Sequence, residues 1–235
     1  MLILGFDATA IACSAALIED KKIISEISLN RGSKHSEQLL PVIDNVLKLA
    51  RKDMNQVDLI ALSAGPGSFT GVRIAAATGK ALAQASNKKI IQINSLDALA
   101  QNVKIENALI VPLLDARKNE FYTAWYRFQN GKMEKVKNDY AVSPDNLAEE
   151  LKSENEKVYL FGEGLEKYAK GIKESLGEQA VILPAEFGSI KGSAVSLLAE
   201  EKAEKGEFSN YYTLAPVYLR RPEAEITWEA KHCGR

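Results

Sequence analysis

The stretch Gly65-Pro66-Gly67-Ser68-Phe69-Thr70-Gly71-Val72-Arg73 decides how the surrounding chain folds. Before it, residues 58–64 form a short apolar run that is typical of a buried strand. After it, residues 72–87 are rich in alanine and contain no proline, so they predict a helix. A strand, a glycine turn and a helix N-terminus together favour an anion site, because free N–H groups and the helix dipole converge there. The simpler interpretation is that the glycines only turn the chain and that Ser68 or Thr70 caps the helix.

The composition narrows the class of protein. The chain has 235 residues with 30 basic and 31 acidic side chains, so its net charge of -1 draws it to neither nucleic acid nor an anionic membrane. No apolar run approaches the roughly 20 residues of a membrane span, and the N-terminus lacks the basic segment of a signal peptide. Two cysteines and two histidines are too few for a tetrahedral zinc site or a Cys/His nucleophile pair. We therefore expect a cytoplasmic protein with no metal site.

The order of predicted elements repeats. Three strands within residues 2–29 precede a helix over 39–51, and the strand and helix around the glycine turn lead to a strand at 88–93 and a helix at 95–100. A second round of the same order follows from Ala108 onward, in which Asp115 corresponds to Asp7. Two rounds of βββαβαβα predict a duplicated α/β fold with two lobes, residues 1–104 and 105–235.

The first two predicted helices have more apolar surface than one sheet can cover. In the helix over 39–51, apolar residues including Leu39, Val42, Ile43 and Val46 cover about half of the circumference. In the helix over 72–87, Ile74, Ala75, Ala81 and Leu82 predict the sheet-facing side. A second, small-residue face consists of Val72, Ala76, Gly79 and Ala83, flanked by Arg73 and Lys80. Either another part of this chain or a partner protein covers that second face.

The chemistry at the glycine turn is incomplete. The turn lacks the Gly-Lys-Ser/Thr ending of a P-loop and the spacing of the dinucleotide fingerprint. Asp7 ends the first strand, where an actin-like fold places a carboxylate beside metal and phosphate. The turn at residues 8–12 contains no glycine, and neither does the corresponding turn at 117–119, so the backbone approaches a phosphate less readily. The candidate anion- or nucleotide-binding residues are Asp7, Gly65, Gly67, Ser68 and Thr70.

Several motifs together resemble one family, the TsaB proteins, which are also called YeaZ. These motifs are Asp7-Ala8-Thr9, His35-Ser36-Glu37-Gln38-Leu39-Leu40-Pro41, the glycine stretch ending at Arg73, Asp115-Ala116-Arg117-Lys118-Asn119-Glu120-Phe121-Tyr122, and Pro216-Val217-Tyr218-Leu219-Arg220. The resemblance covers nearly the whole chain. It implies a two-lobed actin-like ATPase fold, described as ASKHA or RNase H-like, in the bacterial cytoplasm.

The resemblance also implies a function and partners. TsaB proteins take part in making N6-threonylcarbamoyladenosine at position 37 of tRNA, and the catalytic subunit is the larger paralogue TsaD, which holds a metal through a paired-histidine motif. Here the residue four positions after His35 is Leu39, which fits a non-catalytic subunit. The implied partners are TsaD, the ATPase TsaE and a second copy of the chain when it is alone, with tRNA contacted at most indirectly. No cofactor of the chain's own is implied, and any ATP belongs to the assembled complex.

The expected TsaD-binding surface joins the first two helices: Leu39, Val42, Ile43, Val46, Val72, Arg73, Ala76, Gly79, Lys80 and Ala83. On this assignment, Ala76→Glu weakens the complex. Two other functions remain open at this stage. One is a stand-alone actin-fold ATPase or kinase that uses Asp7 and the glycine turn. The other is a peptidase, for which the sequence shows no nucleophile or metal constellation.

Overall fold

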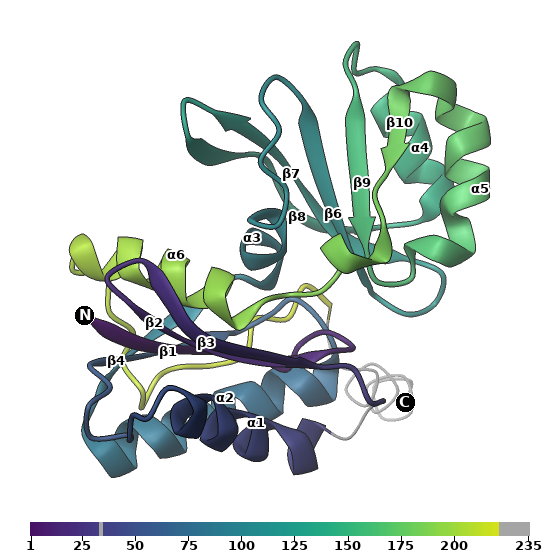
Figure 1. Cartoon of the computed structure of the whole chain (residues 1–235). Coiled ribbons are helices and arrows are strands. Elements are labelled where there is room, and N and C mark those ends of the chain that lie inside the picture. The colour runs from purple at the N-terminus through teal and green to yellow at the C-terminus, as the bar shows by residue number, and fades with distance from the viewer. Residues whose placement is uncertain (33–34, 221–235) are drawn as a thin grey trace, which may run out of the picture.

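Each half of the chain builds a five-stranded mixed sheet from the same order of elements, as Figure 1 shows. The computed structural model describes residues 1–32 and 35–220. The first round comprises β1 (Leu2–Asp7), β2 (Cys13–Glu19), β3 (Lys22–Leu29), α1 (His35–Leu49), β4 (Leu59–Ser63), α2 (Phe69–Ser86), β5 (Lys89–Ile93) and α3 (Ser95–Ala100). The second comprises β6 (Leu109–Asp115), β7 (Phe121–Gln129), β8 (Lys132–Val142), α4 (Pro144–Lys152), β9 (Val158–Gly162), α5 (Leu165–Leu176), β10 (Ala180–Ile182) and α6 (Gly192–Glu204). Two short 3₁₀ helices, η1 (Gly177–Gln179) and η2 (Ala185–Phe187), flank β10.

The strand order confirms the duplication. The first sheet runs β3-β2-β1-β4-β5, and the second runs β8-β7-β6-β9-β10 when it is read in the same direction. In both sheets the meander is antiparallel, and the last two strands join it in parallel. Parallel strands need a crossover connection, which the helices between them provide. The duplicated, two-lobed α/β class predicted from the sequence is therefore confirmed.

Three hydrophobic cores follow from this layering. One lies between the first sheet and helices α1 and α2, and another lies between the second sheet and helices α4 and α5. The third joins both sheets through α3 and α6, and it includes Ile3 and Ile91 from the first sheet with Ile110 and Phe161 from the second. The two lobes therefore share a core.

Helix α6 follows the second sheet in the sequence, but it packs against the first sheet. It packs on the first sheet, on the side opposite α1 and α2 (Figure 1). Gly192 at its start lies so close to the backbone of Ala15 and Ala16 that a Cβ would overlap it, and Ser209 beyond it pairs with Ile90. The predicted boundary between residues 1–104 and 105–235 is therefore wrong for α6, because the first sheet needs a cover on its second face. The residues after Arg220 lie outside the described part of the chain.

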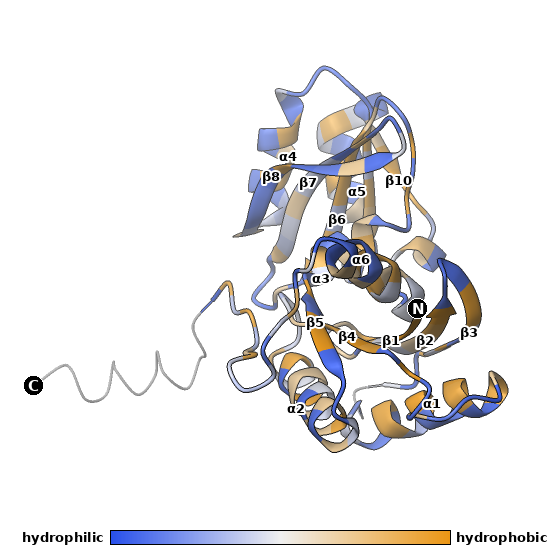
Figure 2. Ribbon diagram, turned by 90° about the vertical axis from the view of Figure 1, so that its left-hand side faces the viewer, coloured by the Kyte–Doolittle hydropathy of each residue, from blue (hydrophilic) through white to orange (hydrophobic). Residues whose placement is uncertain are grey.

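The small-residue face of α2 packs against its own sheet, so the prediction that a partner protein covers this face is wrong. Val72, Ala76 and Ala83 are buried in the core beneath the first sheet, and a Cβ on Gly79 would lie 2.8 Å from Leu62 Cδ2 of β4. These small residues let α2 approach its own sheet closely. Figure 2 shows α1 and α2 side by side below the largely hydrophobic strands β1 and β4.

The same correction applies to α1. Its four predicted contact residues, Leu39, Val42, Ile43 and Val46, are all buried in that core. Of the predicted partner-binding set, only Arg73 and Lys80 reach the surface. The surface that α1 and α2 leave open instead consists of Leu40, Arg73, Ile74, Ala77, Lys80 and Ala81, which we call the outer α1–α2 face.

Candidate functional site

A cleft of about 680 Å³ lies between the two lobes. Turns at the ends of the strands line it from both sides, together with the start of α2 and the C-terminal segment 217–220. Among the predicted anion-binding residues, Gly67, Ser68 and Thr70 line the cleft, whereas Asp7 and Gly65 do not. The structure therefore brings part of the predicted site together at the place where two lobes meet.

Asp7 is sealed beneath the turn that follows it. Its side chain is fully buried, and its Oδ1 accepts hydrogen bonds from the Thr9 amide at 3.2 Å and the Thr9 hydroxyl at 2.7 Å. The Thr9 hydroxyl also lies 2.9 Å from that of Ser95. Burial raises the pKa of Asp7, although the hydrogen bonds from Thr9 oppose the rise. In this arrangement Asp7 holds its own turn and does not face the cleft.

The glycines of the 65–71 turn allow its backbone to lie directly against the backbone of Ala8 and Thr9. A Cβ on Gly71 would overlap the carbonyl oxygen of Ala8, and one on Gly67 would overlap that of Thr9. The Ser68 amide donates to the Thr9 carbonyl at 2.7 Å, and the Gly71 amide donates to Ser68 Oγ at 3.3 Å. Ser68 is thus the N-cap of α2, as the simpler interpretation predicted. Anion binding at this turn stays a prediction, and two of the amides it would use already have partners.

The corresponding turn of the second lobe has an unusual backbone. Arg117, Lys118 and Asn119 all have positive φ angles, 62°, 51° and 57°. Such angles are uncommon for residues other than glycine and are maintained only where the surroundings hold them. Asn119 Oδ1 accepts from the Tyr168 hydroxyl at 2.8 Å and from Lys167 Nζ at 3.0 Å, which holds the turn against α5. The turn thereby presents Arg117 and Lys118 at the cleft.

Glu163 is a residue of the cleft that sequence reasoning missed. It lies in the β9–α5 turn, and its carboxylate accepts a hydrogen bond from the Ile11 amide in the first lobe. Burial raises the pKa of Glu163 to about 7, and the nearby charges of Asp7 and Asp115 act in the same direction. The sequence does contain a signal for this residue: Glu163 lies between Gly162 and Gly164, at the place where the first lobe has Pro66 between two glycines.

The C-terminal segment crosses the cleft from one lobe to the other. The Val217 amide donates to the Ala64 carbonyl at 2.7 Å in the first lobe. Arg220 pairs with Glu120 and donates to the Ala116 carbonyl at 3.5 Å in the second lobe. The motif at residues 216–220 is thus part of a bridge between the lobes, while Arg221, His232 and Cys233 lie outside the described residues.

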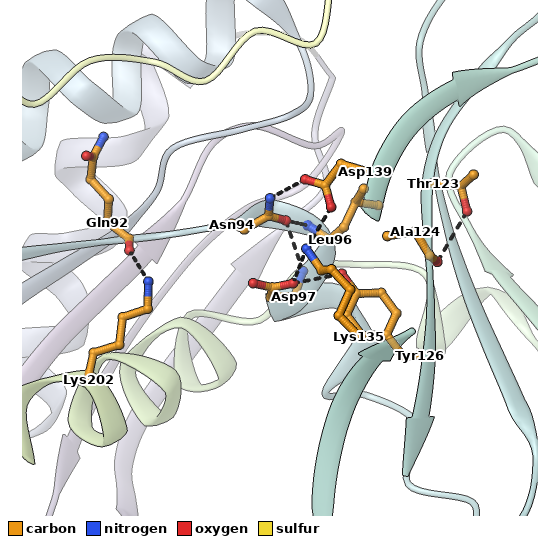
Figure 3. Close-up of polar contacts among 10 residues, drawn as sticks. All are labelled: Gln92, Asn94, Leu96, Asp97, Thr123, Ala124, Tyr126, Lys135, Asp139 and Lys202. Carbon is orange, nitrogen blue, oxygen red and sulfur yellow. Dashed lines mark hydrogen bonds and ion pairs between the residues drawn. The ribbon is translucent and has the colours of Figure 1, made fainter. Parts of the chain in front are cut away.

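A partly buried polar network joins α3 to the second sheet, as Figure 3 shows. Lys135 of β8 lies 2.7 Å from both Asp97 of α3 and Asp139 of its own strand. The Tyr126 hydroxyl donates to Asp97 at 2.8 Å, and Asn94 donates to Asp139. Burial alone would lower the pKa of Lys135, but the two carboxylates outweigh it and raise that pKa. The network fixes α3 against the second sheet.

Three further findings concern His35, metal binding and membrane spans in the described part of the chain. His35 is buried at the start of α1 and lines the cleft, and its Nδ1 has no hydrogen-bond partner among these residues. Within residues 1–32 and 35–220, no group of three or more His, Cys, Asp or Glu side chains is placed to hold a metal ion. In the same part of the chain, no helix combines the length and apolar character that crossing a membrane requires.

The duplicated mixed sheets and the interlobe cleft define a protein of the actin-like ATPase fold. The ROK hexokinase from Thermus thermophilus shares this fold with a TM-score of 0.50 at 14% identity, covering 87% of this chain and 100% of the hexokinase. YeaZ from Pseudomonas aeruginosa matches better, with a TM-score of 0.78 at 27% identity, covering 93% of this chain and 99% of YeaZ.

The sequence comparisons lead to a particular family. Residues 22–228 match the family model described as TsaD, tRNA N6-adenosine threonylcarbamoyltransferase. The chain is 31% identical over 228 residues to the tRNA threonylcarbamoyladenosine biosynthesis protein TsaB of Bacillus subtilis (strain 168), covering 97% of this chain and 98% of that protein. The chain belongs to the TsaB (YeaZ) family, within the group of sequences that the TsaD model describes.

Proposed function

We propose that this chain is a non-catalytic subunit of the complex that makes N6-threonylcarbamoyladenosine at tRNA position 37. In this role it binds and activates the paralogue TsaD and helps to recruit the ATPase TsaE. Membership of the TsaB family supports the pathway, since the curated relative is named for this biosynthesis. The match to the TsaD model supports a paralogous relation between the two subunits.

One observation carries the non-catalytic part of the proposal. The carboxylate that an actin-like enzyme would turn towards metal and phosphate, Asp7, is fully buried and hydrogen-bonded to Thr9. Gly67 and Gly71 pack against the carbonyls of Thr9 and Ala8, so protein backbone lies where a phosphate cradle would need space. The proposed partner surface is the outer α1–α2 face, which keeps Arg73 and Lys80 from the predicted set.

Reconstituted tRNA modification tests the proposal. With TsaD and TsaE present, we expect threonylcarbamoylation of tRNA to require this chain, and we expect the chain alone to support no transfer. A complex of this chain with TsaD should also appear in size-exclusion chromatography, in competition with a homodimer of the chain. Modification at an equal rate without the chain would contradict the proposal.

The residues that line the cleft also support a second candidate function, that of a stand-alone ATPase or kinase. The volume of the cleft, the hydroxyls of Ser68 and Thr70, and the cations Arg117 and Lys118 are compatible with a phosphate-bearing ligand. Calorimetric titration of the isolated chain with ATP and Mg²⁺ separates the two functions. Tight binding with turnover would favour the enzyme, whereas binding only in the presence of TsaD would favour a nucleotide held by the assembled complex.

A further inference from the structure

Arg73, at the exposed start of α2, is held in a fixed position by two aromatic residues. The guanidinium carbon lies 3.9 Å from the centroid of the Phe69 ring, and Nε donates to the Tyr218 hydroxyl at 3.0 Å. The rings of Phe69 and Tyr218 stack with their centroids 4.7 Å apart. A side chain ordered in this way loses little further conformational entropy when it binds a ligand.

The charge of Arg73 is not neutralised by the described part of the chain. No carboxylate among those residues pairs with it, whereas Arg117 and Arg220 each pair with one and Arg127 pairs with two. Helix α2 contains no acidic residue at all. Because Nε is used by Tyr218, the two terminal nitrogens remain for a planar, two-pronged pair with an oxyanion.

The surroundings of Arg73 favour a protein carboxylate over a phosphate of nucleic acid. The next exposed positions along α2 are apolar, Ala77 and Ala81, with Ile74 half-buried beside them, and Lys80 is the other cation of the helix. Nucleic-acid sites instead collect several cations along a surface. An arginine and a tyrosine within a small apolar patch are the composition of a protein-binding hot spot.

We propose that Arg73 receives an Asp or Glu carboxylate of the protein that binds the outer α1–α2 face, and that Tyr218 positions it for that contact. The inference rests on the proposed function and adds the chemistry of the partner: an acidic side chain bordered by apolar ones. It also gives the C-terminal segment a role at the interface. Leu214 is buried in the first lobe, and the Val217 amide bonds to Ala64, so Tyr218 stands at a fixed place beside α2.

Calorimetric titration of the full chain with TsaD from the same organism tests this inference. We expect Arg73→Gln to weaken binding about 10- to 100-fold, in the range of interface hot spots. Arg73→Lys keeps the charge but loses the planar fork and the stacking, so we expect it to weaken binding nearly as much. Tyr218→Phe keeps the ring and removes only the hydroxyl, so a loss of about 3- to 10-fold is expected.

The double variant distinguishes positioning from an independent contact. If Tyr218 acts through Arg73, then Arg73→Gln with Tyr218→Phe binds no more weakly than Arg73→Gln alone. Lys170→Gln, at an exposed position of α5 in the second lobe, is the matched control and should leave the affinity unchanged. Thermal melting of each variant shows whether the fold is retained.

Three outcomes would count against these assignments in different ways. A wild-type chain that fails to bind TsaD refutes the proposed function itself. A wild-type chain that binds, with Arg73→Gln and Arg73→Lys equally tight, overturns only the role of Arg73. If Arg73→Gln leaves TsaD binding intact but abolishes binding of tRNA by the complex in a filter assay, the arginine serves a phosphate and the inference is likewise overturned.

Discussion

Glu163 is the side chain through which the second lobe hydrogen-bonds to the first-lobe backbone at Ile11, in a part of the cleft where an ionised carboxylate is poorly solvated. Its pKa of about 7 means that the folded protein holds this proton more tightly than the unfolded chain, where the ordinary value is 4.5. The contribution of Glu163 to the free energy of unfolding therefore falls as the pH rises from about 4.5 to about 7.

Glu163→Gln should remove this dependence. The amide oxygen still accepts from Ile11, but the side chain cannot ionise. We expect the variant to raise the free energy of unfolding by on the order of 1–3 kcal/mol at pH 8 and to change it little at pH 4.5. Urea titrations at the two pH values measure the effect, with exposed Glu166→Gln as the control. A variant that is less stable than wild type at pH 8 would show that the carboxylate is needed as an anion.

Gly71 gives a second prediction at the residue scale. Its Cα faces the Ala8 carbonyl without room for a methyl group. Gly71→Ala should therefore lower the free energy of unfolding by about 1–3 kcal/mol, because the two turns must separate. Gly171→Ala in α5 is the matched control: a Cβ there meets nothing within 4 Å, and alanine favours the helix, so equal or higher stability is expected. Equal melting temperatures for Gly71→Ala and wild type would contradict the close packing.

At the scale of single elements, α2 has two faces with different tasks. Its buried face of small residues sets the distance to the first sheet, and its outer face carries Arg73 with exposed alanines. The sequence could not separate these faces, because alanine and glycine occur on nearly every side of the helix and give little contrast in hydrophobicity. The close contacts of Gly79 with Leu62 and of Gly71 with Ala8 fix the orientation of the helix.

This orientation changes what substitutions in α2 should do. Ala76→Glu places a charge in the core beneath the first sheet, so we now expect it to unfold the protein, at a cost of more than about 3 kcal/mol, and not merely to weaken a complex. Ala77→Glu, one residue on and exposed, should leave the melting temperature nearly unchanged while weakening TsaD binding about 5- to 50-fold. If Ala76→Glu melts like wild type, the buried face has been misassigned.

At the scale of the whole molecule, the shared core and the Lys135 network hold the lobes together. Lys135 neutralises Asp97 and Asp139, which belong to elements on either side of that junction. Lys135→Met leaves both carboxylates without a cation, so we expect the free energy of unfolding to fall by about 1–2 kcal/mol, since solvent screens part of the interaction. Chemical denaturation followed by tryptophan fluorescence measures the change, with exposed Lys132→Met on the same strand as control. If Lys135→Met and Lys132→Met lower the free energy of unfolding equally, the network stabilises the protein no more than an exposed lysine on β8 does.

Sequence patterns predicted the elements well and their packing partners poorly. The strands and helices follow from local apolar patterns and caps such as Ser68 and Ser143, which depend on a few neighbouring residues. The position of α6 depends on the uncovered face of a sheet that ends a hundred residues earlier. Similarly, the sealing of Asp7 depends on how Thr9 and Ser95 meet across the fold. Such contacts between distant segments leave no periodic signal in the chain.

The packing of α6 determines which truncated fragments of the protein can fold. A fragment cut after residue 104 would contain all five strands of the first sheet, yet the face that α6 normally covers would be open to water. The complementary fragment would carry α6 and the Tyr218 segment without the sheet that receives them. Neither half is an autonomous folding unit on this arrangement, and because both lobes share a core through α3 and α6, studies of partner binding should keep both lobes and rely on point variants.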